Sequence, residues 1–202
     1  MLCPVNLSRG TASHKRCVLL IDTRKVPIGG IKFSEERVHF SICCPYNEQA
    51  TINDILQHIS KKQVTIPFLC HLSGSSGTKT CFCVSAGDVE LISDVAHFSC
   101  DKNLSISCQR NVASITIFPH RNNLTLVPLV MCLMDGLQLP VYSFSTSISA
   151  LVFNTDFHLL ELLAHHLTDV FDLPDNHSPF HPEFQLRQPR SSSESEDLTW
   201  RP

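Results

Sequence analysis

The side chains with most potential for metal or redox chemistry in this 202-residue chain belong to its 10 cysteines and 11 histidines. Cys81 and Cys83 are two positions apart, so they would share one face of a strand, and Cys70 precedes His71. Structural zinc sites more often carry their cysteines on a turn, with a spacer of about two to four residues. We therefore interpret Cys81 and Cys83 as small residues that face a helix. A metal or redox protein built on Cys70, Cys81 and Cys83 is an alternative of another class.

Histidine pairs and catalytic motifs add no further site. His165 and His166 are adjacent, so on a helix they diverge by about 100° and need a third element to share a metal. The chain contains no Gly-x-Ser-x-Gly, no His-Glu-x-x-His and no glycine-rich phosphate loop. The sequence therefore predicts no catalytic residue, no bound metal and no cofactor.

Composition excludes several classes of protein. The 16 Lys and Arg nearly balance the 19 Asp and Glu, and the formal net charge is −3. A nucleic-acid binder usually has a basic face, so we expect no nucleic-acid partner. No apolar run approaches the ~20 residues of a membrane helix, and no secretion signal is evident, so we expect a cytoplasmic protein with reduced thiols.

Apolar periodicity predicts the order strand, helix, strand, strand, helix twice, with a period of about 75 residues. In the first passage the strands are residues 38–43, 64–72 and 78–85. Its helices are residues 52–61, with Thr51 as the N-cap, and a segment from Asp88 onward, with Val89, Ile92 and Val95 as its buried stripe. In the second passage the strands are residues 112–118, 139–145 and 147–153. Its first helix is residues 126–137, with Pro128 in the first turn and Val127, Val130, Met131 and Met134 on one face. Its second is a long helix that Asp156 caps and Leu173-Pro174 ends.

This order is the ferredoxin-like βαββαβ plan, which needs a closing strand in each unit. Residues 104–108 can close the first unit, and residues 16–22 can cross over and close the second. The first unit is then inserted in the second. We predict an α+β fold of two ferredoxin-like domains in tandem with a disordered C-terminal tail. The predicted boundaries are a leader 1–15, a strand segment 16–27 of the second domain, a first domain 28–108, a second domain 109–174 and a tail 175–202.

Four phrases then suggest a family. Ile28-Gly29-Gly30-Ile31-Lys32-Phe33, continuing to Ile42, is similar to an opening hairpin, and Gln63-Val64-Thr65-Ile66 is similar to an apolar strand that follows it. The phrase from Leu139 to Ser147 resembles a second-domain strand that ends Ser-Thr-Ser. Residues 156–174 resemble a closing helix. Together, over residues 29–174, they resemble the paired ACT domains in the regulatory region of aspartate kinases. The kinase domain is absent, because too few residues precede the hairpin for a nucleotide-binding fold.

The resemblance implies binding of a small effector amino acid, commonly lysine or threonine, near a strand-to-helix loop at a domain interface. A helix N-terminus presents unpaired N–H groups, which suit an α-carboxylate. The residues that the resemblance places in the effector site are Asn47, Glu48, Gln49, Ala50, Thr51, Ile52, Asn123, Thr125, Ser145, Thr146 and Ser147. A solvated, helix-capping loop at 47–49 and a plain turn at 145–147 are the alternatives.

The leading hypothesis is a regulatory module without chemistry of its own, which senses an amino acid and forms a homodimer through its ACT domains. A separate aspartate kinase is a possible partner. Asn47 and Ala50 stand where the family has Asp and Gly, which favours an alternative, a regulatory or assembly subunit that binds no ligand. A fragment of a longer kinase is a further alternative.

Overall fold

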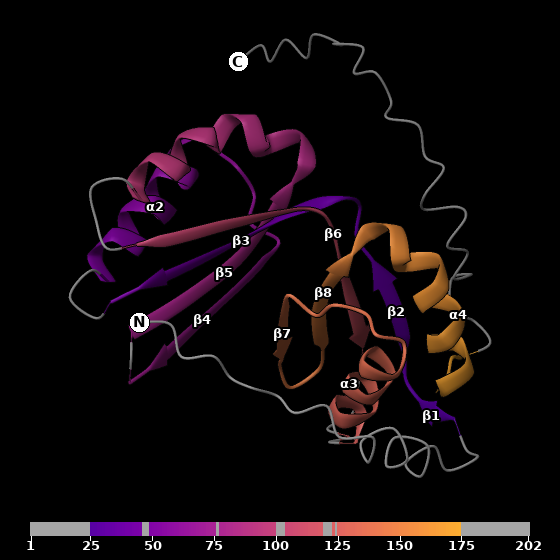
Figure 1. Cartoon of the computed structure of the whole chain (residues 1–202). Helices are drawn as coiled ribbons and strands as arrows, with labels where there is room; N and C mark the ends of the chain where they lie inside the picture. Colours follow the sequence, from indigo (N-terminus) through magenta and orange to yellow (C-terminus); the bar gives the residue numbers. More distant parts are fainter. Residues whose placement is uncertain are drawn as a thin grey trace, which may run out of the picture.

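The computed structural model describes residues 25–45, 49–75, 77–99, 104–118, 123 and 125–174. The predicted leader 1–15, the predicted crossing strand 16–22 and the tail 175–202 lie outside the described residues. Within those residues the chain is a mixed α+β protein built on a mostly antiparallel sheet (Figure 1).

The main sheet has the order β4-β5-β3-β6-β8-β7, and β2 pairs with β6 beside this path. The strands are β2 (Gly30–Phe33), β3 (Arg37–Cys44), β4 (Phe68–Gly74), β5 (Gly77–Ser85), β6 (Ser105–Phe118), β7 (Ser143–Thr146) and β8 (Leu151–Asp156). A separate parallel pair joins β1 (Val26–Pro27) to β9 (Phe171–Asp172). The helices are α2 (Gln49–Lys61), the 3₁₀ segment η2 (Ala86–Ser99), α3 (Leu126–Gly136), the short 3₁₀ turn η3 (Phe157–Leu159) and α4 (Leu160–Val170).

The first unit buries the helix-facing side of β3, β5 and the start of β6 under α2 and η2. Alternation along β3 puts Val38, Phe40 and Ile42 on this side, and Phe40 stacks on Phe82 of β5 with ring centroids 5.1 Å apart. The predicted helical stripe of Val89, Ile92 and Val95 is confirmed, since all three are buried. The predicted N-cap at Thr51 is wrong. Helix α2 begins two residues earlier, and the Thr51 side chain is buried in its first turn.

The second unit buries its own core between α3, α4 and the other half of the sheet. Pro128 falls in the first turn of α3, as predicted. The predicted inward face of α3 is partly wrong. Val130 and Met134 are buried, but Met131 is 43% exposed and Leu126 and Leu129 take the inner positions. The pattern of apolar residues runs almost all round α3, so the sequence left the orientation of its inward face open.

Strand β6 runs through both units without a break. We predicted two strands, at 104–108 and 112–118, and the structure joins them. Its first half pairs with β3, and its second half pairs with β8. The register shifts between them, since Arg37 lies opposite Val112 but His39 lies opposite Gln109. Asn111 in this bulge has φ 56°, a left-handed conformation that asparagine tolerates better than most residues.

The segment that we predicted as an opening hairpin, from Ile28 to Ile42, is not a hairpin. Strands β2 and β3 do not pair with each other in the ladder, because each pairs with a different half of β6. Gly30 lies opposite Phe118 and Phe33 lies opposite Ile115, so β2 borders the sheet of the second unit. The division into domains at 28–108 and 109–174 remains a prediction.

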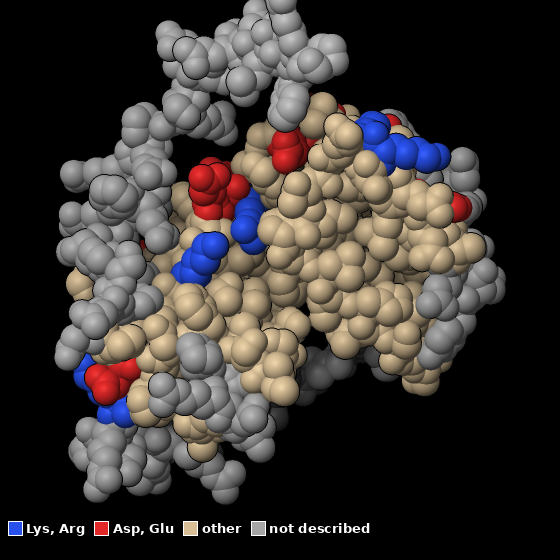
Figure 2. Space-filling model, turned by 180° about the vertical axis from the view of Figure 1, so that it is seen from behind, with Lys and Arg blue, Asp and Glu red and all other residues tan. Residues whose placement is uncertain are grey.

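The helices and the surface charge bear on two classes that the composition disfavours, membrane proteins and nucleic-acid binders. Of the described helices, none combines the length and the apolar character that a membrane span requires. The rear face in Figure 2 shows basic and acidic side chains interspersed in a largely uncharged surface. On that face the described residues form no extended basic patch.

Candidate functional site

The predicted site residues around the N-terminus of α2 fall into two groups. Asn47 and Glu48 lie outside the described residues, and Gln49 is the first residue of the helix. Ala50 is exposed. Thr51 and Ile52 are 1% and 3% exposed, so their side chains lie in the protein interior rather than at the surface of the loop.

The predicted site residues of the second unit bond to their own neighbours. Asn123 Oδ1 accepts hydrogen bonds from the Thr125 backbone N–H at 3.0 Å and from the Thr125 hydroxyl at 2.5 Å. Ser147 Oγ accepts from the Ala150 N–H at 3.1 Å, and the Ser147 N–H donates to the Ala150 carbonyl at 2.8 Å. Ser145 and Thr146 are the last two residues of β7. These bonds close local turns.

A chain of hydrogen bonds joins the two units where β3 and β5 meet β7 and β8. The Arg37 guanidinium donates to Ser114 Oγ at 2.9 Å, and the Ser114 hydroxyl donates to Asn154 Oδ1 through a short bond. Asn154 Nδ2 donates to Ser143 Oγ at 2.7 Å, which leaves the Ser143 proton for Nε2 of His39 at 3.0 Å. Asn154 is fully buried and Ser114 and His39 are 3% and 4% exposed, so these groups depend on each other.

Burial controls the protonation states in this junction. Desolvation, with a contribution from Lys79, lowers the pKa of His39 to about 4, so its imidazole is neutral at pH 7. Desolvation also raises the pKa of Cys83 to about 12. The Cys83 thiol is therefore protonated and donates to Asn154 Oδ1 at 3.6 Å. The neutral imidazole can accept the Ser143 proton, which an imidazolium could not.

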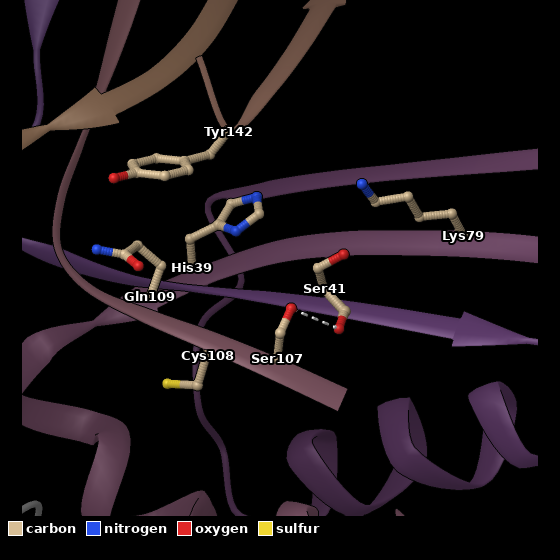
Figure 3. Close-up of a pocket in the computed structure, with 7 residues that line it drawn as sticks. All are labelled: His39, Ser41, Lys79, Ser107, Cys108, Gln109 and Tyr142. Carbon is tan, nitrogen blue, oxygen red and sulfur yellow. Dashed lines mark hydrogen bonds between the residues drawn. The ribbon is translucent and has the colours of Figure 1, made fainter. Parts of the chain in front are cut away.

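A hollow of about 220 Å³ lies beside this junction (Figure 3). It is on the face of the first unit's strands that is turned away from α2 and η2. Strand alternation brings side chains from β3, β5 and β6 to this face, and Tyr142 of the second unit lies over them. Tyr142 donates its hydroxyl proton to Asp156 at 2.6 Å, and its ring centroid is 6.0 Å from that of His39. Desolvation, reinforced by Asp156, raises the pKa of Tyr142 to about 12. The lining residues are His39, Ser41, Lys79, Ser107, Cys108, Gln109 and Tyr142.

Cys70, Cys81 and Cys83 lie on the same face of the sheet as the hollow, turned away from α2 and η2. Cys81 and Cys83 are buried, but they do not face a helix as we predicted. They pack with Phe68 of β4, and Val152 of the second unit packs against this cluster. Cys70 lies opposite Cys81 in the β4–β5 ladder. Within the described ranges, no group of three or more His, Cys, Asp or Glu side chains is placed to hold a metal ion.

Solved structures share this arrangement of strands and helices. The regulatory subunit of aspartate kinase from Thermus flavus matches with a TM-score of 0.62 at 9% identity, over 72% of this chain and 99% of that chain. The chain has the fold of an aspartate kinase regulatory subunit. Aspartate kinase from Clostridium acetobutylicum matches with a TM-score of 0.60 at 13% identity, over 75% of this chain and 37% of that chain. Neither a family model nor a curated protein sequence matches the chain.

The regulatory-subunit fold confirms the resemblance stated from the sequence phrases, as far as the fold is concerned. Aspartokinase III from E. coli, solved in complex with lysine and aspartate, matches with a TM-score of 0.55 at 7% identity, over 73% of this chain and 34% of that chain. The match to the Thermus flavus protein is to a regulatory subunit and not to a kinase catalytic domain.

Sequence reasoning missed two features that join the units of this regulatory-subunit fold, namely the buried hydrogen-bond chain through Asn154 and the hollow beside Tyr142. One signal was available, because the alternation of Val38, Phe40 and Ile42 with His39 and Ser41 already predicts a polar face on β3. Nothing in the sequence indicated that Asn154 and Tyr142, more than 100 positions away, would meet that face.

Proposed function

We propose that this chain is an amino-acid-binding regulatory module, which senses a small effector such as lysine or threonine and controls an aspartate kinase without chemistry of its own. The observation that carries the proposal is the structural match over 99% of the length of a regulatory subunit of that enzyme. In this proposal residues 28–108 and 109–174 act as two ACT domains. The chain forms a homodimer through them, and the kinase is a separate partner.

The proposed effector contacts are at the N-termini of the two helices that follow the first strand of each unit. Ala50, which is exposed in the first turn of α2, belongs to the first position together with Asn47, Glu48 and Gln49, where the positive end of the helix dipole favours a carboxylate. Asn123 and Thr125 at the start of α3, with Ser145, form the second. Since the Thr125 hydroxyl donates to Asn123 Oδ1, an effector carboxylate there has to compete with that bond.

Thermal unfolding of the full chain with L-lysine, L-threonine and their D-enantiomers tests the proposal. A ligand at about 100 times its Kd adds about 2.7 kcal/mol, which is a rise in Tm of about 5–10 °C for a chain of this size. Thr125→Ala should weaken the response, whereas Thr168→Ala on α4, whose hydroxyl bonds within its own helix, should not. No shift with either L-amino acid would refute the sensor hypothesis.

A second candidate is a regulatory or assembly subunit that binds no effector. The local bonds of Asn123, Thr125 and Ser147 favour it, because these polar groups already have partners within their own turns. In this case sedimentation of the chain mixed with an aspartate kinase should show a complex whose affinity is the same with and without lysine or threonine. An effector-dependent affinity would favour the sensor.

A further inference from the structure

The hollow under Tyr142 has one charged group in its lining. Lys79 on β5 is exposed and, among the described residues, forms neither of the ion pairs that the structure contains. His39 contributes a neutral ring, because desolvation and the nearby Lys79 lower its pKa to about 4. No Asp or Glu lines the hollow. Its electrostatic potential therefore favours a ligand with a single negative charge.

Two hydrogen-bond donors line the same hollow as this cation. The Ser107 hydroxyl donates to the Ser41 carbonyl at 3.4 Å, and Gln109 Nε2 donates to the Arg110 carbonyl at 3.3 Å. Both donor–acceptor distances exceed the usual range, which is about 2.7–3.2 Å for an N–H donor and about 2.5–3.0 Å for an O–H donor, so these donors can turn to a better acceptor at little cost. A carboxylate has two oxygens and about four acceptor positions, so it can accept from an ammonium and from a hydroxyl or amide donor of the lining together.

The size and the cover of the hollow limit the rest of the ligand. A volume of about 220 Å³ is below the roughly 300–1,000 Å³ of pockets for drug-sized ligands, so the hollow suits a small ligand. The Tyr142 ring covers the hollow, while its hydroxyl is already bonded to Asp156. An α-ammonium group in this space would find Lys79 and no carboxylate among the lining residues. The lining therefore disfavours an amino acid.

We propose that this hollow binds a small monocarboxylate that lacks an amino group, of the hydroxy-acid or keto-acid class, with its carboxylate on Lys79 and its remaining atoms beneath the Tyr142 ring. Lys79 belongs to the first unit and Tyr142 to the second, so the ligand bridges the two units and stabilises the arrangement described above. The inference does not rest on the proposed function, since it uses other residues and another class of ligand.

The test compares three probes of nearly equal size, L-lactate, pyruvate and L-alanine, by NMR titration of the ¹⁵N-labelled full chain in the millimolar range. Sodium chloride at equal ionic strength is the control for screening. We expect lactate or pyruvate to shift the amide signals of Ser107 and Gln109 in a saturable manner. L-Alanine should bind about tenfold more weakly or not at all.

Variants at exposed lysines make the test specific. Lys79→Met should weaken lactate or pyruvate binding about tenfold or more, and Lys79→Arg should retain part of it. Lys32→Met, at an exposed position on β2 outside the hollow, should change nothing. The proposal is overturned if neither acid binds, if L-alanine binds equally well, or if Lys79→Met leaves the affinity unchanged. A response to lysine or threonine that persists in Lys79→Met would support the effector proposal and leave the result for the hollow separate.

Discussion

Replacing Asn154 by leucine tests whether the buried polar chain holds the two units together. Leucine has a similar volume but cannot bond to Ser114 or Ser143, and it also removes the acceptor of the Cys83 thiol. An unsatisfied buried polar group costs about 1–3 kcal/mol, and Ser114 and Cys83 are 3% and 0% exposed. The added apolar burial recovers about 1–2 kcal/mol. We therefore expect Asn154→Leu to lower the free energy of unfolding by about 2–4 kcal/mol.

Urea unfolding followed by circular dichroism measures this change, with the slope m checked for two-state behaviour. The corresponding decrease in Tm is about 6–12 °C for a change of 3 kcal/mol. Ser145→Ala is the matched control, since Ser145 lies two positions from Ser143 on β7, and its effect should stay within about 0.5 kcal/mol. Combined with Ser143→Ala, the leucine variant should be non-additive by at least about 0.5 kcal/mol. A loss below about 1 kcal/mol, or simple additivity, would refute the view that the chain of bonds acts as a unit.

Three further predictions follow from single groups. Unfolded His39 takes up its proton near pH 6.5 and folded His39 only near pH 4, so the free energy of unfolding should fall by about 3 kcal/mol as the pH decreases through this window. His39→Gln should remove this part of the pH dependence. Equal pH slopes in urea titrations of both proteins would contradict the prediction. Because Asn111 has φ 56°, Asn111→Gly should preserve the free energy of unfolding, whereas Asn111→Val should lower it by about 1–2 kcal/mol in the same assay. Equal effects of the two substitutions would show that the bulge does not depend on this conformation. Burial raises the pKa of Cys83 to about 12, so native Cys83 should resist iodoacetamide at pH 8 while exposed Cys43 reacts; early labelling of the Cys83 peptide in mass spectra would disprove this.

The regular elements could be predicted because their apolar residues recur with the period of the element. Strand β3 and the helix that follows it are clear in the sequence, since Val38, Phe40 and Ile42 alternate and Ile52, Ile55 and Ile59 follow at helical spacing. The inward face of α3 was not determined, because its apolar residues run nearly all round the helix. The pairing of β2 with β6 also escaped prediction, because pairing across 80 or more positions leaves no local pattern.

The fold could be predicted from the sequence, but the candidate site could not. The sequence phrases were sufficient for the fold of the regulatory subunit, since fold depends on the order and spacing of elements. The predicted effector contacts rest on family resemblance alone, and the hollow with Lys79 and Tyr142 appeared only once the units were in place.

By itself the sequence determined most of the helices and strands and the polar face of β3, because these follow from the local spacing of apolar residues. Tertiary structure alone decided that β6 continues through a bulge at Asn111 from one unit into the other. That bulge lets the strand pair with β3 and β8 in turn, which brings His39 against Ser143 and Tyr142. These contacts join residues from distant parts of the chain, and their energy depends on desolvation that only the packed protein provides.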